Sequence, residues 1–191
     1  MKKLTLPDME RAFGYMGDYL VQRKTLGEIA LYGGSAIMFQ FEWRQSSQDV
    51  DAVVISDGNH GLVREAVNYA AKKMDLENSW LSDNVSVYAS TSAQEKDFKY
   101  AGMYPQNGKP GLRVIAAKPE YVLAMKLVAL QRSTVQDRDF QDATNLALEI
   151  GLDTQDQLRA IFGKFFPGEE LSFKASERLP ELEAEIARRK L

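Results

Sequence analysis

Two aspartates one residue apart, Asp49 and Asp51, lie in the clearest strand-like stretch of the sequence, residues 49–55. This stretch is rich in β-branched side chains, which favours a β-strand. Because residues i and i+2 of a strand point to the same face, we expect the two carboxylates side by side, about 7 Å apart. Two like charges beside a buried strand are unfavourable unless a cation neutralises them. The pair therefore predicts a divalent metal site that binds the oxygens of a nucleoside triphosphate. The simpler alternative is that Asp49 caps the strand and Asp51 faces solvent.

A second candidate is the turn formed by Gly33, Gly34 and Ser35. Glycines let the backbone approach a phosphate closely. If the following helix begins at Ser35, its first N–H groups and its dipole favour a bound anion. The alternative is an ordinary turn with a serine N-cap, since many such turns bind nothing.

The elements that must position these residues form one supersecondary unit. A short strand is expected before the turn and a buried helix after it, and thirteen residues separate Ser35 from Asp49. This is enough for a short helix and a return, so neighbouring strands would bring the turn and the carboxylates together. The expected elements of this region are helices at 7–24, 36–43 and 61–74 and strands at 29–32, 49–55, 85–89 and 112–116.

From Pro119 onward the pattern is helical, with a proline well suited to a first helical position. Strands thus occupy the first two thirds of the chain and helices the last third. We expect an α/β (α+β) core over residues 1–118 and a helical subdomain packed on it over residues 119–191. The helices expected there cover 121–130, 140–150, 155–165 and 179–189.

The glycine turn and the aspartate pair together carry a resemblance. Residues 32–54 resemble the core motif of the DNA polymerase β-like nucleotidyltransferase superfamily, a Gly-Ser turn followed by Asp-x-Asp or Asp-x-Glu. Arg44 and the polar residues 46–48 resemble the AbiEii-like branch, which includes toxins of bacterial toxin–antitoxin and phage-defence systems. Residues 80–83 are similar to the Trp-Leu-Asn-Asp of one bacterial group of such proteins. The resemblance covers residues 28–150.

The resemblance implies a nucleotidyltransferase-type mixed sheet flanked by helices, and a metal-dependent transfer of a nucleoside monophosphate to a hydroxyl acceptor. Asp49 and Asp51 would hold Mg²⁺ or Mn²⁺. The nucleoside triphosphate would be bound by Gly33, Gly34, Ser35 and Arg44. The implied acceptor is RNA, with tRNA as one candidate, and the implied partner is a cognate antitoxin protein.

Two later motifs also resemble the AbiEii-like branch. Lys126 is the only charge in residues 121–130, and in a helix that is apolar nearly all round it must snorkel or find a carboxylate or phosphate. Asp139 and Asp142 are three residues apart, on one helical face, or are simply favourable acidic residues in a first turn. The resemblance implies that Lys126 contacts phosphates or a catalytic aspartate, and that Asp139 and Asp142 give catalytic support or act as general base.

One feature departs from the superfamily pattern. Many of its enzymes carry a third carboxylate on a later core strand, but the strands expected at 85–89 and 112–116 contain none. Asp139 or Asp142 would substitute, as in the AbiEii-like branch. If neither does, the alternative is a non-catalytic module that binds a nucleotide or a protein on the same fold.

The composition narrows the chemistry. The absence of cysteine excludes disulfides and thiolate sites, and the single His60 excludes a multi-histidine metal centre. A metal would therefore be held by carboxylates, which suits Mg²⁺ or Mn²⁺. The net charge of −3 is unlike a dedicated duplex-DNA binder, although local patches matter more than the sum. We find no signal-peptide pattern and no apolar run near the roughly 20 residues of a membrane span, and expect a cytoplasmic protein.

Overall fold

The computed structural model describes residues 3–55, 58–132 and 137–190. The chain forms two compact units. The first, which we call the sheet unit, comprises Met1–Val87 and Phe98–Ala117. The second, the helical unit, comprises Tyr88–Asp97 and Lys118–Leu191.

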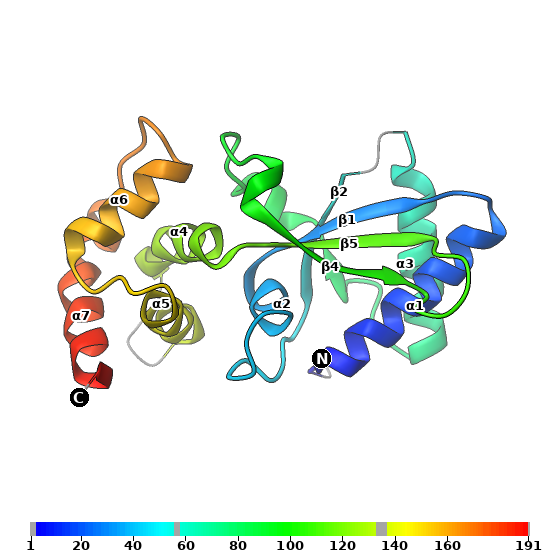
Figure 1. Cartoon of the computed structure of the whole chain (residues 1–191), viewed down its shortest axis with the longest axis horizontal. Helices are drawn as coiled ribbons and strands as arrows, with labels where there is room; N and C mark the ends of the chain where they lie inside the picture. Colours follow the sequence, from blue (N-terminus) through cyan, green and yellow to red (C-terminus); the bar gives the residue numbers. More distant parts are fainter. Residues whose placement is uncertain (1–2, 56–57, 133–136, 191) are drawn as a thin grey trace. The chain divides into compact units, whose positions relative to one another are not determined.

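The sheet unit contains one five-stranded mixed sheet. The strand order is β3-β2-β1-β5-β4. Strand β1 is antiparallel to β2 and parallel to β5, and these central strands run side by side in Figure 1. Strand β3 is parallel to β2, and β4 is antiparallel to β5. In chain order the elements are α1 (Leu6–Gln22), β1 (Gly27–Leu31), α2 (Gly33–Met38), β2 (Val50–Val54), α3 (His60–Met74), β3 (Leu81–Ser82), the 3₁₀ turn η1 (Asn84–Val87), β4 (Phe98–Tyr104) and β5 (Leu112–Ala117).

Helices α1 and α3 cover one face of the sheet. A Cβ added to Gly27 in β1 would lie 2.9 Å from the side chains of both Leu20 in α1 and Val63 in α3. Side chains alternate between faces along a strand, and antiparallel pairing with β1 places Ala52 of β2 on this covered face. Its neighbour Asp51 therefore points to the opposite face of the sheet.

Local sequence signals explain where α1 begins and how it packs. The side chains of Thr5 and Asp8 form a capping box that satisfies backbone N–H groups at the helix start. Pro7 occupies one of the first two helical positions, where no N–H partner is needed. The buried residues follow helical spacing and enter the core of the sheet unit. They are Met9, Ala12, Phe13, Met16, Gly17 and Leu20.

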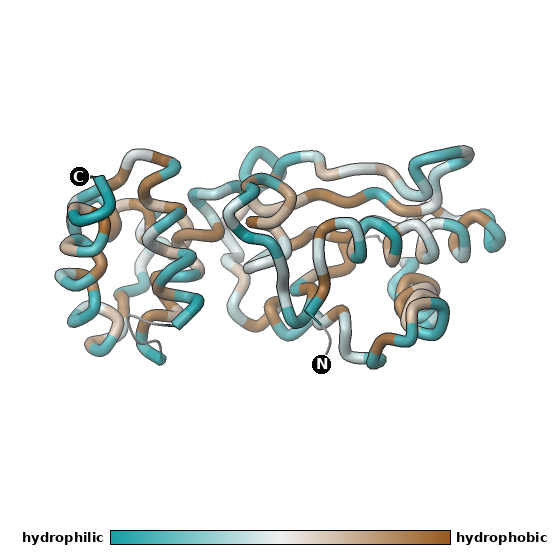
Figure 2. Tube along the Cα trace, turned by 90° about the horizontal axis from the view of Figure 1, so that it is seen from below, coloured by the Kyte–Doolittle hydropathy of each residue, from teal (hydrophilic) through white to brown (hydrophobic). Residues whose placement is uncertain are grey.

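The helical unit is built around α4, which is apolar on nearly all sides. Helix α4 contacts α5, α6 and α7, so its buried residues form the centre of this unit. In Figure 2 hydrophobic and hydrophilic residues alternate along the C-terminal helix, as expected for a helix with one buried face. The elements are η2 (Glu95–Asp97), α4 (Pro119–Ala129), η3 (Leu130–Arg132), α5 (Arg138–Glu149), α6 (Gln155–Phe165) and α7 (Phe173–Lys190).

The segment Tyr88–Asp97 belongs to the helical unit although it lies between two strands of the sheet in sequence. The backbone N–H of Ser90 donates to the hydroxyl of Tyr121 in α4 at 2.7 Å, and the Ser90 hydroxyl donates to the carbonyl of Phe165. The backbone N–H of Lys118 donates to the carbonyl of Asp97 at 2.9 Å. These bonds attach both ends of the segment to the helices.

The predicted fold class is confirmed: a mixed sheet is flanked by helices. The strand expected at residues 85–89 is wrong, because residues 84–87 form a 3₁₀ turn, and β3 and β4 were not expected. The helix expected at 36–43 begins at Gly33 and ends at Met38, with Tyr32 as its extended N-cap. None of the helices in the described part of the chain has both the length and the apolar character that a bilayer-spanning helix requires.

Candidate functional site

Asp51 is the second residue of β2, and its backbone is bonded to the turn that follows β1. The Asp51 carbonyl accepts a hydrogen bond from the N–H of Tyr32 at 2.9 Å. The hydroxyl of Ser35 donates to the carbonyl of Tyr32 at 2.7 Å and approaches the Asp51 carbonyl at 3.3 Å. Ser35 is fully buried. The turn and the strand are therefore held together through the residue that carries the carboxylate.

The Asp51 carboxylate lies directly against Gly33. A Cβ added to Gly33 would be 2.5 Å from Oδ2 of Asp51, closer than real Cβ atoms approach an oxygen. Gly33 also has a φ of +53°, which L side chains rarely adopt. The structure thus brings Gly33, the first residue of α2, against one of the two predicted carboxylates, and both the φ and the close contact favour glycine there.

Gly34 is packed against a cation. A Cβ on Gly34 would lie 2.8 Å from Nη2 of Arg44 and 3.1 Å from the hydroxyl of Ser47. The loop that carries Arg44 is fixed by an antiparallel bridge, in which Leu4 and Ser47 exchange backbone hydrogen bonds of 2.7 and 2.9 Å. Arg44 therefore places a positive charge beside the glycine turn.

Asp49 lies in a bend one residue before β2, not in the strand as predicted. The strand begins at Val50, whose N–H donates to the carbonyl of Trp80 at 2.8 Å. The alternation rule that placed Asp49 and Asp51 on one face applies only within a strand. Asp49 is half-buried at the start of β2.

The sequence did not identify Ser82 as a neighbour of the site. Strand β3 has two residues, and Ser82 is the partner of Asp51 across β2 and β3. A two-residue strand has no periodicity to detect, and the resemblance of residues 80–83 does not indicate a contact with Asp51. The next residue, Asp83, forms an ion pair with Arg64 of α3.

Among the described residues, no three or more histidine, aspartate or glutamate side chains are grouped so that they could hold a metal ion.

In the helical unit, the structure brings together three predicted residues. The ammonium of Lys126 in α4 is 2.5 Å from Oδ1 of Asp139 and 3.0 Å from Oδ2 of Asp142, both in α5. The side chain of Lys126 is 11% exposed and that of Asp142 is 3% exposed. Arg132 lies 4.0 Å from the other oxygen of Asp139. Lys126 therefore does not snorkel to solvent, because its ammonium forms ion pairs with two carboxylates of its own unit.

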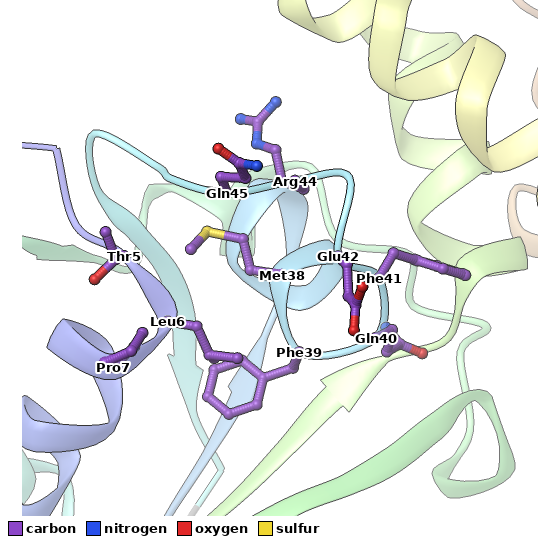
Figure 3. Close-up of a pocket in the computed structure, with 10 residues that line it drawn as sticks. All are labelled: Thr5, Leu6, Pro7, Met38, Phe39, Gln40, Phe41, Glu42, Arg44 and Gln45. Atoms are coloured by element: carbon purple, nitrogen blue, oxygen red, sulfur yellow. The ribbon is translucent and has the colours of Figure 1, made fainter.

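A pocket of about 410 Å³ lies between the start of α1 and the end of α2. Figure 3 shows Leu6 beside the ring of Phe39 and the guanidinium of Arg44 directed away from both. Arg44 is one of the residues that line the pocket, and its guanidinium lies against Gly34. The lining residues are Thr5, Leu6, Pro7, Met38, Phe39, Gln40, Phe41, Glu42, Arg44 and Gln45.

Of three comparisons with known proteins, the one with solved structures gives a match. No family model matches the sequence, and no curated protein sequence matches it. The crystal structure of an antigenic nucleotidyltransferase-like protein from Paracoccidioides brasiliensis is similar over 97% of this chain and 95% of that chain, with a TM-score of 0.50 and 12% identity. At this identity the similarity concerns the fold alone. The fold of this chain is therefore nucleotidyltransferase-like.

Proposed function

We propose that this protein is a metal-dependent nucleotidyltransferase that moves a nucleoside monophosphate from a triphosphate to a hydroxyl acceptor and releases pyrophosphate. The observation that carries the proposal is the contact between Gly33 and the Asp51 carboxylate. It joins a backbone that a phosphate can approach closely to a carboxylate that can hold a cation. The nucleotidyltransferase-like fold supports this reading.

The donor type of the two carboxylates suits Mg²⁺ or Mn²⁺. Asp49 and Asp51 offer oxygen donors, which these cations prefer. The space that a Cβ of Gly33 would fill is occupied by the Asp51 carboxylate, so a cation on Asp51 would lie beside the glycine turn. When bound, the ion would neutralise charge on the triphosphate oxygens.

The triphosphate itself would be held by the turn and by Arg44. The guanidinium of Arg44 already lies against Gly34 and presents several donors in a planar fork suited to phosphate. The hydroxyl of Ser35 is bonded to protein carbonyls, so we assign its contact with phosphate to the backbone N–H.

The resemblance assigns the proton chemistry to Lys126, Asp139 and Asp142, and we keep this assignment as part of the proposal. Asp139 is 30% exposed, and Lys126 and Arg132 lie close to its two oxygens. We assign to Asp139 the acceptance of the proton of the acceptor hydroxyl. Lys126 would hold Asp139 in place through their ion pair of 2.5 Å.

The proposal also covers the branch of the superfamily, the acceptor and the protein partner. The motifs around Arg44, Lys126 and Asp139 support the AbiEii-like branch. We therefore propose RNA, with tRNA as the first candidate, as the acceptor. The setting would be a bacterial cytoplasm, with the protein acting as the toxin of a toxin–antitoxin pair and a cognate antitoxin as its partner.

Calorimetry tests the proposal. Each of the four nucleoside triphosphates is titrated with and without Mg²⁺ into the wild type, the double variant Asp49→Ala/Asp51→Ala and Asp51→Asn. We expect Mg²⁺-dependent binding of at least one triphosphate by the wild type and its loss in both variants. Asp83→Asn is the matched control, because it removes the same charge at an exposed site paired with Arg64. No binding by the wild type, or unchanged binding by Asp51→Asn, would overturn the assignment.

A second candidate function is a non-catalytic module that binds a nucleotide or a protein. The observation that favours it is the ion cluster of Lys126, Asp139 and Asp142, in which the lysine already forms ion pairs with two carboxylates. Such a module would bind a triphosphate without consuming it. Release of pyrophosphate in the presence of RNA distinguishes the two functions.

A further inference from the structure

The hydroxyl of Ser35 has its hydrogen-bond partners inside the protein. The residue is fully buried, and its hydroxyl oxygen lies 2.7 Å from the carbonyl oxygen of Tyr32 and 3.3 Å from that of Asp51. A serine near a helix start often bonds to a carbonyl three residues earlier, which accounts for the bond to Tyr32. This local preference does not explain why the hydroxyl also approaches the carbonyl of Asp51, which lies sixteen residues later in another element.

We infer that Ser35 is a positioning residue for Asp51. The Asp51 carbonyl receives both the Tyr32 N–H at 2.9 Å and the Ser35 hydroxyl at 3.3 Å. These two donors set the distance between the turn and β2 at the residue whose carboxylate lies against Gly33. We call these two hydrogen bonds to the Asp51 carbonyl the latch. The inference rests on the proposed function, in which the latch places the Asp51 carboxylate for a cation.

Removing the hydroxyl leaves every backbone partner in place. The carbonyl of Tyr32 still accepts the N–H of Ala36 at 3.1 Å, and the Asp51 carbonyl still accepts the N–H of Tyr32. Ser35→Ala therefore leaves neither carbonyl without a donor, and we expect it to fold. What it removes is the second donor that holds the turn against the strand.

The chain offers a matched control in Thr144. This residue is also fully buried, and its hydroxyl donates to the carbonyl of Phe140 at 2.9 Å within α5. Thr144→Val removes a buried hydroxyl and its bond to a local carbonyl while keeping the side-chain shape. It does so in the helical unit, whereas Asp51 belongs to the sheet unit. Ser35→Cys is the conservative variant, since a thiol keeps a weak donor.

The first readouts need neither metal nor nucleotide. In Ser35→Ala we expect amide exchange of Tyr32, followed by NMR, to become about tenfold faster as the latch loosens. We also expect the ¹³Cγ resonance of Asp51 to shift. Thr144→Val should leave both unchanged, and Ser35→Cys should lie between the wild type and Ser35→Ala. If Ser35→Ala moves neither the Tyr32 exchange rate nor the Asp51 resonance, the inference is overturned.

The second readout is the affinity for Mn²⁺ alone, measured by electron paramagnetic resonance. Loss of an outer group that orients a metal-binding carboxylate lowers metal affinity by about tenfold or more, and we expect this for Ser35→Ala. Unchanged affinity in Ser35→Ala, with affinity lost in Asp51→Asn, would reject the positioning role and keep the proposed function. A wild type that binds no Mn²⁺ would reject the proposed function, while the NMR readouts still decide whether Ser35 positions Asp51.

Discussion

Lys126 in α4 and Asp142 in α5 form an ion pair of 3.0 Å that is almost completely removed from solvent. A buried carboxylate without its cation lowers the stability of the fold. The pair therefore fixes the position of α4 along α5. Asp139 joins the same ammonium at 2.5 Å from one turn earlier in α5. The cluster therefore has a structural role whether or not it also takes part in chemistry.

Removal of this lysine should destabilise the protein strongly. Lys126→Met leaves the carboxylate of Asp142 buried without its cation, and we expect a loss of about 3 kcal/mol in the free energy of unfolding, measured in urea. The double variant Lys126→Met/Asp142→Leu should lose less than the single variant, because both charges are gone. Lys190→Met, which breaks an exposed pair with Asp153, should cost no more than about 1 kcal/mol. A loss no larger in Lys126→Met than in this control would contradict the prediction.

Gly33→Ala should impair ligand binding more than folding. The backbone conformation at φ +53° costs an L residue about 1–2 kcal/mol, and the new methyl group would displace the Asp51 carboxylate. We expect Mg²⁺-dependent nucleotide binding to disappear in calorimetry while the chain still unfolds cooperatively. Gly108→Ala is the control, because it has a φ of +94° and open space around its Cβ position. Equal binding by the two variants would show that the contact between Gly33 and Asp51 is irrelevant to the site.

Substitution by alanine should change the stability of the protein in opposite directions at two glycines of α1. The Cβ position of Gly14 is open, so Gly14→Ala should stabilise the helix by up to about 1 kcal/mol. At Gly17 the new Cβ would lie 2.2 Å from the carbonyl oxygen of Tyr104, so Gly17→Ala should cost about 3 kcal/mol through overpacking. Thermal unfolding of both variants checks the prediction. A stable Gly17→Ala variant would mean that α1 packs less closely on β4.

Acid should weaken α7 through Glu185. Hydrogen bonds from Arg188 and then Arg189 lower the pKa of this carboxyl from 4.5 to about 2. A pKa lowered by folding adds stability above the unfolded value, and this stability is lost as pH falls from 4.5 towards 2. Glu185→Gln should therefore flatten the dependence of the melting temperature on pH within this window. A wild type and variant with parallel pH profiles there would exclude the contribution.

The sequence predicted helices better than the contacts of the site. Helix α6 was expected at residues 155–165 and forms Gln155–Phe165, since Thr154 and Gln157 make a capping box and the apolar spacing is regular. Strand β4 was not predicted. It is an edge strand in which Lys99 and Tyr100 are both exposed, and its pairing register with β5 shifts before Gly102. It therefore lacks clean alternation.

The site was predictable in its residue types but not in its bonds. The Asp-x-Asp and Gly-Gly-Ser patterns located Gly33 and Asp51, which do meet. The strand boundary put Asp49 outside β2 by one residue, a shift that patterns do not resolve. The second partner of Ser35 lies sixteen residues away in another strand, so no local signal could reveal it.

The membership of Tyr88–Asp97 in the helical unit has a practical consequence for dissecting the protein. The chain crosses from one unit to the other three times, after Val87, after Asp97 and after Ala117. A truncation at Ala117 would therefore leave this segment without the helices that bind Ser90 and Asp97. To express the sheet unit alone, a short linker must join η1 directly to β4 in place of Tyr88–Asp97. To express the helical unit alone, Tyr88–Asp97 must be fused to the N-terminal side of α4.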